Sequence, residues 1–137
     1  MKNKTQFYFL SFTWGIILTL IGLIVAFVLI CCGKKPEKWG GCLLFRTKGF
    51  DGLNLGIVMI VGQGASEHTK NHEFGHAIQN CKYGPATPFI VHIPSVVRYW
   101  YREIKYYWRN LTPPTAYDDA WFEGEASKLG TEAIKYW

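Results

Sequence analysis

The chain has 137 residues, of which 49% are hydrophobic and 17% aromatic, and its formal net charge at pH 7 is +5. This length suits one domain and is too short for two independent hydrophobic cores. The positive charge is best explained by lysines that follow a long apolar segment. The sequence carries no nucleic-acid-binding signature, so we expect no nucleic-acid partner.

The first predicted element is an apolar helix. After a short tail over residues 1–6, no charged residue occurs from Phe7 to Cys32. At 1.5 Å rise per residue, 24 helical residues cover about 36 Å, which is enough to cross a hydrocarbon core of about 30 Å with some tilt. A cleaved signal peptide would have a shorter apolar core and small residues at its cleavage site. The sequence therefore predicts an uncleaved, single-pass transmembrane anchor over residues 7–32, with the lipid bilayer as partner.

Positively charged residues are more frequent after this anchor than before it. Lys2 and Lys4 precede it, and five follow it closely: Lys34, Lys35, Lys38, Arg46 and Lys48. This excess favours a body on the cytoplasmic side of a bacterial inner membrane. The same side chains could instead bind anionic lipid head groups. The four cysteines, at positions 31, 32, 42 and 81, permit disulfides but do not establish any.

Residues 33–137 are expected to form one small α+β domain. In its glycine-rich first part, short strands over Cys42–Phe45 and Leu53–Val61 are predicted around a turn at Lys48–Gly52. The run Ile57–Val61 is continuously apolar, which predicts a strand that is buried on both faces or lies against a membrane. The edge of such a strand could hold an extended peptide, but packing alone explains the apolar run better.

The next predicted element is a helix between Ser66, a plausible N-cap, and Gly84, which precedes a proline. Apolar residues recur inside it at the helical period and form one stripe: Phe74, Ala77, Ile78 and Cys81. The run His72-Glu73-Phe74-Gly75-His76 lies on this helix. Its two histidines project from the side opposite the stripe, about one turn apart.

This His-Glu-x-x-His pattern is typical of a zinc site. His72 and His76 can bind one tetrahedral ion, whereas Glu73, about 100° round the helix, can reach a metal-bound water without being a ligand. Zinc lowers the pKa of its water towards about 7, and a nearby carboxylate can take the proton as the water attacks an amide carbonyl. The pattern also arises by chance, and both histidines would then lie on a solvated face. We predict a Zn2+ site with Glu73 as general base.

Three prolines lie within residues 84–95 and exclude a regular helix there, so we expect a loop that packs on the anchor or dips into the membrane interface. A helix is predicted from Pro94 to Arg109, with six aromatic and four basic residues interleaved. This composition is typical of an amphipathic helix at lipid head groups. Stacking on single-stranded nucleic acid would use similar residues, but the neighbouring anchor favours lipid.

The last predicted helix extends from Tyr117 to Trp137 and follows a proline-containing linker. Its buried stripe is expected to comprise four residues: Phe122, Ala126, Leu129 and Ala133. Glu123 and Glu125 flank this stripe on opposite sides, and periodicity does not choose between them as a metal ligand. Gly130 is expected to bend the helix or end it early.

Together these motifs resemble a known class of zinc peptidases. A metzincin would have a glycine and a histidine where Gln79 and Lys82 stand, which excludes that class. A gluzincin takes its third ligand from a glutamate on a later helix. In membrane gluzincins related to CAAX prenyl peptidases that helix reads Glu-x-x-Ala-Asp, and Glu123-Gly124-Glu125-Ala126-Ser127 matches at Glu and Ala.

The chain is more closely similar to a group of small bacterial membrane proteins with a gluzincin-type pattern. The similarity covers about residues 40 to 130 and includes, in matching order, Gln79, Gly84-Pro85, Ile93-Pro94-Ser95 and Leu129-Gly130. It implies that His72, His76 and Glu123 bind zinc. Ser127 departs from the pattern, because an aspartate there would orient a metal-binding histidine. Serine brings no charge, so we expect weaker zinc binding or a different supporting partner.

The sequence thus predicts a mainly α membrane protein with one transmembrane helix and a zincin-like α+β domain. Its expected function is a membrane-anchored zinc metalloendopeptidase, with a peptide or protein as substrate. The oxyanion of the intermediate would need a further donor, for which His68, His92 and Tyr117 are candidates, although each is more often a structural residue. One alternative is a metal-stabilised membrane scaffold without hydrolytic activity. A membrane-binding peptide or toxin would leave the histidine pattern as coincidence.

Overall fold

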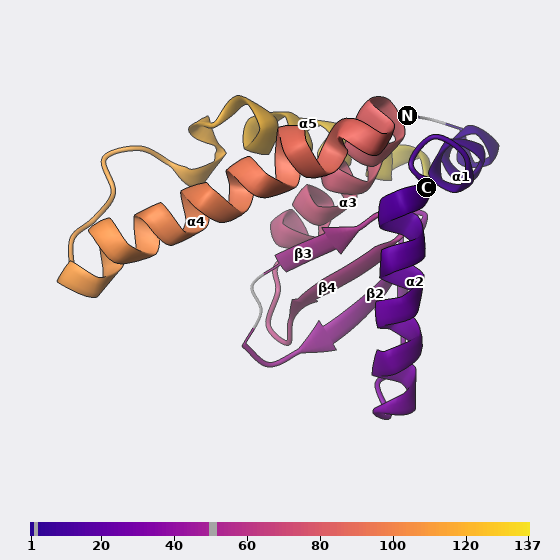
Figure 1. Ribbon diagram of the computed structural model, residues 1–137, viewed down its shortest axis with the longest axis horizontal. Helices are drawn as coiled ribbons and strands as arrows, with labels where there is room; N and C mark the ends of the chain where they lie inside the picture. The colour runs from indigo at the N-terminus through magenta and orange to yellow at the C-terminus, as the bar shows by residue number, and fades with distance from the viewer. Residues whose placement is uncertain (2, 50–51) are drawn as a thin grey trace.

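The computed structural model of the chain describes residue 1, residues 3–49 and residues 52–137. Within these residues the chain is mainly helical and includes one four-stranded sheet (Figure 1). Three of the residues used above lie outside the described part: Lys2, Phe50 and Asp51. The longer elements follow in this order: α1 (Lys4–Phe12), α2 (Ile16–Cys31), β1 (Glu37–Trp39), β2 (Cys42–Thr47), β3 (Gly52–Leu55), β4 (Val58–Gly62), α3 (Glu67–Tyr83), α4 (Ile93–Lys105) and α5 (Trp121–Ala133).

The predicted straight anchor over residues 7–32 is wrong as a single helix, because α1 and α2 are bent by 91°. The chain turns at Gly15, whose carbonyl accepts a hydrogen bond of 3.0 Å from Asn80 Nδ2 on α3. A Cβ at Gly15 would lie 2.4 Å from that amide nitrogen, so a glycine permits the close approach. Among the described residues, no helix by itself has the length and hydropathy to cross a membrane, although α1 and α2 taken together do.

The sheet has the strand order β1-β2-β4-β3, and β4 is its buried centre. The buried strand expected over Ile57–Val61 is confirmed in β4. The pairing around it differs from the prediction, because Leu53–Val61 forms two strands that turn at Gly56, which has a φ of 65°. Strand β2 then pairs with β4 in parallel, so the predicted hairpin between Cys42–Phe45 and Leu53–Val61 is wrong. The alternation of apolar residues locates strands but does not say which strands pair.

Helix α3 begins and ends where the sequence predicts. The hydroxyl of Ser66 accepts a hydrogen bond of 3.1 Å from the backbone nitrogen of Thr69, and Gly84 ends the helix with a φ of 55°. The predicted apolar stripe on α3 is buried, and it joins α1, β2 and β4 in the hydrophobic core.

Helices α3 and α5 touch backbone to backbone at two glycines. A Cβ at Gly75 would lie 1.8 Å from the carbonyl oxygen of Ala126, and a Cβ at Gly130 would lie 1.7 Å from that of Asn71. Gly130 lies inside α5, which continues to Ala133, and allows a close crossing with α3. Helix α5 is shorter than predicted at both ends, because 3₁₀ turns at Tyr117–Asp119 and Ile134–Tyr136 flank it.

Residues 84–95 are helical, which corrects the predicted loop. A 3₁₀ turn at Gly84–Ala86 and a π-helix at Pro88–His92 lead into α4. The prolines stand in the first turns of these short segments, where a missing N–H group costs no helical hydrogen bond. Helix α4 then extends away from the rest of the molecule (Figure 1).

Candidate metal centre

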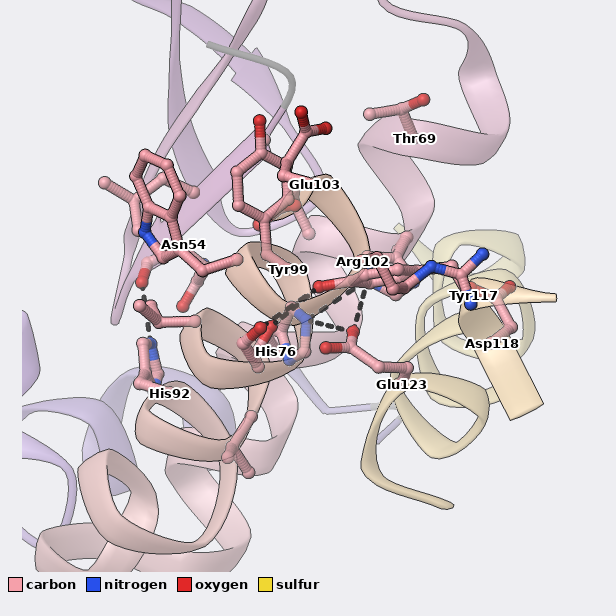
Figure 2. A pocket seen from close by; sticks show the side chains of 18 of the residues that line it. Asn54, Thr69, His76, His92, Tyr99, Arg102, Glu103, Tyr117, Asp118 and Glu123 are labelled. Atoms are coloured by element: carbon pink, nitrogen blue, oxygen red, sulfur yellow. Dashed lines mark hydrogen bonds and ion pairs between the residues drawn. The ribbon is translucent and has the colours of Figure 1, made fainter. Parts of the chain in front are cut away.

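The three predicted metal ligands come together between α3 and α5. Oε2 of Glu123 lies 3.0 Å from His72 Nε2 and 3.3 Å from His76 Nε2, and the two Nε2 atoms are 3.2 Å apart. Figure 2 shows His76 and Glu123 pointing toward one another. Tetrahedral coordination with bonds of about 2.0–2.1 Å separates ligand atoms by about 3.3 Å. The spacing therefore fits one metal ion held by His72, His76 and Glu123.

Each imidazole is oriented through its other ring nitrogen. Nδ1 of His72 lies 2.8 Å from Oγ of Ser127, which donates its own proton to Asp118 Oδ2 at 2.7 Å. The serine oxygen must then accept from Nδ1–H, so Nε2 of His72 presents a lone pair to the metal position. Asp118 thus supplies, through Ser127, the negative charge that an aspartate at position 127 would supply directly. The expectation of a different supporting partner fits this arrangement.

Gln79 does the same for His76. Its Oε1 lies 2.8 Å from His76 Nδ1, and its amide nitrogen donates to the carbonyl of Phe122 and to Glu125, both at 2.8 Å. These two acceptors fix the amide so that its oxygen faces the imidazole. Glu125 also receives hydrogen bonds from Lys82 and Tyr83, so the described contacts turn it away from the metal position.

The buried carboxylate of this centre favours positive charge beside it. Glu123 is 0% exposed, and its Oε2 pairs with His72 Nε2 at 3.0 Å and with His76 Nε2 at 3.3 Å, contacts that need a proton or another cation between the atoms. Burial acts to raise the pKa of Glu123, but the contacts with His72 and His76 outweigh it and hold the pKa well below its usual range. Burial acts to lower the pKa of His76, yet the contact with Glu123 raises it. Positive charge between the three ligand atoms, either a proton or a metal ion, therefore stabilises the carboxylate of Glu123.

Glu73 is a second buried carboxylate at the same site. It is 6% exposed, and its Oε2 has no hydrogen-bond partner among the described residues. Burial raises its pKa, although the nearby His76 and His72 lower it in part. A raised pKa brings a carboxylate closer to neutral pH, where a general base works best.

An open cavity of about 830 Å³ gives access to these groups, a volume typical of ligand-binding sites. Its lining includes His72, Glu73, His76 and Glu123 together with residues of β3 and α4. Strand β3 is an edge strand and lies against the site, since a Cβ at Gly52 would stand 2.2 Å from Glu73 Oε1. The run Ile57–Val61 has no free edge for a substrate, because β4 pairs on both edges with β2 and β3, and packing, the favoured explanation, accounts for it.

The three candidate oxyanion donors all line this cavity but differ in their contacts. His92 Nε2 lies 2.9 Å from the carbonyl oxygen of Asn54 on β3, and burial lowers the pKa of this imidazole. The hydroxyl of Tyr117 lies 3.2 Å from Ser95 Oγ, and burial raises its pKa to about 12, so it keeps its proton at neutral pH. His68 is exposed and lies 3.5 Å from Asp118, and its ring centroid is 6.5 Å from that of His72. Tyr117 also hydrogen-bonds to Glu123, so it is the donor that we assign to the site.

Comparison of the chain with models of protein families, with curated proteins and with solved structures finds no match. The interpretation of the site therefore rests on its own geometry and chemistry.

Proposed function

We propose that the protein is a membrane-associated zinc metallopeptidase of the gluzincin type. The observation that carries this proposal is the combination of three converging ligands with a second buried carboxylate in one open cavity. A structural zinc site normally closes with four protein ligands, whereas a catalytic site uses three and leaves a position open. The second buried carboxylate, Glu73, is the group that a hydrolytic site needs and a structural site does not.

The residues divide the chemistry among them. His72, His76 and Glu123 would hold a zinc ion, which supplies Lewis acidity and a water of lowered pKa when bound. Glu73 would take the proton of the attacking water and return it to the leaving amine. Tyr117, protonated at neutral pH, would donate a hydrogen bond to the oxyanion. The edge strand β3 beside Glu73 would hold an extended peptide by backbone hydrogen bonds.

The membrane part of the proposal is supported by α2. This helix contains no charged residue over Ile16–Cys31, and its larger side chains, such as Ile24 and Phe27, are exposed. Exposed aliphatic surface of this extent is stabilised in lipid and costly in water. The lysines that follow α2 favour a body on the cytoplasmic side.

A Glu73→Gln variant tests the proposal. Glutamine keeps the size of the side chain but cannot accept the proton, so zinc content should be unchanged while peptide cleavage falls by about 10²–10⁴-fold. Zinc is measured by elemental analysis of protein purified in detergent, and cleavage with a fluorogenic peptide library. Glu132→Gln, at an exposed position on α5, is the matched control and should retain full activity.

The metal-stabilised scaffold makes the opposite prediction. A scaffold would bind zinc but show no cleavage in the wild-type protein, and Glu73→Gln would change neither property. That result would contradict the peptidase proposal. Protein without stoichiometric metal would contradict both.

A further inference from the structure

Helix α4 buries a charge and exposes its apolar residues, the reverse of a helix that packs on a hydrophobic core. Arg102 is 8% exposed, whereas Val97 is 62% exposed. At the helical period, five large apolar residues form one exposed stripe along α4 and the turn after it, here called the α4 stripe: Ile93, Val97, Trp100, Ile104 and Trp108. A surface of this kind on a folded chain indicates a partner that covers it.

The orientation of α4 is fixed by its arginines. Arg98 Nη2 donates to the carbonyl oxygen of Ala116 at 3.0 Å, and Arg102 Nη1 donates to that of Thr115 at 2.9 Å. Both guanidinium groups also lie over the ring of Tyr117, at 5.7 and 5.6 Å from its centroid. Rolling α4 to bury the stripe would break all of these contacts, so the fold itself directs the stripe outward.

The α4 stripe is continuous with the cavity of the metal centre. Val96, Trp100 and Tyr107 line the cavity and are also exposed, and Trp100 belongs to the stripe as well. Figure 2 shows Tyr99 and Arg102 of α4 in the same cavity as the metal ligands. Whatever covers the stripe therefore lies beside the mouth of the cavity.

Helix α2 indicates what covers it. Thr19, Gly22 and Ala26 face the sheet, and a Cβ at Gly22 would lie 2.1 Å from the carbonyl oxygen of Leu55. Leu18 is buried as well, but most large aliphatic side chains of α2 are exposed, and small residues toward the protein with large ones outward are the packing of a helix in lipid. Both α2 and α4 thus expose large apolar side chains, which a bilayer explains more simply than two separate protein partners.

The composition of α4 fits the interfacial layer rather than the hydrocarbon core. Exposed tryptophan and tyrosine side chains are typical of the head-group region. Lys105 and Arg109 lie near the C-terminal end of the stripe. Both are exposed, and their positive charges complement anionic lipids.

We propose that the α4 stripe lies in the interfacial layer of a bilayer that contains anionic lipids, so that the cavity opens at the membrane surface. The substrate is then an extended segment of another membrane protein next to its membrane-embedded part. The docking of α4 stands on its own, whereas the substrate class rests on the proposed peptidase function.

Spin labelling of the full chain in vesicles of phosphatidylcholine and phosphatidylglycerol tests the docking. The exposed Cys31 and Cys32 are replaced by serine, and a nitroxide is attached at Val97→Cys or, as a control, at Lys128→Cys on the exposed side of α5. We expect the Val97 label to collide several-fold more with oxygen than with a water-soluble nickel chelate, because oxygen concentrates in lipid. The label at position 128 should show the reverse preference.

Two results would overturn the docking. A Val97 label as accessible to the nickel chelate as the label at position 128 would show that the stripe lies in water. Spin–spin broadening between Val97 labels of different molecules would show that a second copy of the chain covers the stripe.

A cleavage assay tests the substrate class. One peptide is offered free in solution and also joined to a membrane-spanning helix in the same vesicles, where tethering raises its effective concentration. Because Val97 and Ile104 do not line the cavity, the double variant Val97→Asp/Ile104→Asp should cleave the free peptide within about twofold of wild type. It should cleave the tethered one at least about tenfold more slowly. Lys128→Glu is the control and should affect neither.

Equal loss on both peptides, or no preference of the wild-type protein for the tethered one, would overturn the substrate class. If the wild-type protein cleaves neither peptide, the peptidase proposal fails, and the labelling result still decides whether α4 docks on lipid.

Discussion

The metal centre and the outer helices α2 and α4 depart in opposite directions from the usual distribution of charged and apolar residues. Between α3 and α5, the carboxylates of Glu123 and Glu73 are buried, and Oε2 of Glu73 has no hydrogen-bond partner among the described residues. On α2 and α4, large aliphatic and aromatic side chains are exposed while Arg102 is buried. The same short chain therefore places charge where apolar residues normally lie and apolar residues where charge normally lies.

Each departure is costly for an isolated polypeptide. A buried carboxylate without a partner costs several kcal/mol, and a metal ion removes that cost. Exposed aliphatic surface costs about 25 cal/mol for each Å², and lipid removes that cost. Under the two proposals, each region is completed by a component from outside the chain: a cation in one and a bilayer at the other.

The largest effect is expected from Glu123→Ala, which removes one of the three ligands. Zinc affinity should fall by more than the roughly 10–100-fold typical of losing an outer-shell partner. Isothermal titration of metal-free protein measures this. Glu132→Ala, at an exposed position on α5, is the matched control and should leave zinc affinity unchanged. Unchanged zinc affinity in Glu123→Ala would show that Glu123 is not a ligand. Asp118 and Asp119 would then be tested as the third ligand.

A smaller loss of zinc affinity is expected when the link between His72 and the charge of Asp118 is removed. Ser127→Ala breaks the chain of hydrogen bonds from His72 to Asp118, and zinc affinity should fall by about 10–100-fold. Asp118→Asn keeps an acceptor but removes the charge, so its loss should be smaller than that of Ser127→Ala. Asp119→Asn, at the exposed neighbouring position, should bind zinc as the wild-type protein does. Equal affinities in all three variants would show that the hydrogen-bonded charge does not tune the site.

The smallest effect concerns the packing of α2. Gly22→Ala introduces a Cβ 2.1 Å from the carbonyl oxygen of Leu55. We expect the free energy of unfolding in detergent micelles to fall by about 1–3 kcal/mol. Ile24→Ala shortens an outward side chain that micelles or lipid surround, so its effect should stay well below that of Gly22→Ala. Thermal unfolding followed by circular dichroism compares the two. A larger loss in Ile24→Ala would mean that protein, not lipid, covers the outer face of α2.

Much of the metal helix was predictable from the sequence because its signals are local. Ser66 and Gly84 set the ends of α3, and the helical period alone puts His72 and His76 on one face. The apolar run in β4 likewise marked a buried strand. The inverted composition of α4 was visible too, as aromatic and basic residues interleaved at the helical period.

The remaining features depend on which elements meet, and only the tertiary structure decided those. Periodicity left Glu123 and Glu125 equivalent, whereas the close crossing of α3 and α5 at Gly75 and Gly130 brings Glu123 to the histidines. The supporting role of Asp118 is another consequence of that crossing. The bend at Gly15 is also decided at a distance, by Asn80 of α3. Local sequence sets the period and the ends of an element, whereas the close backbone crossings between distant segments form only where a glycine lets the backbones approach.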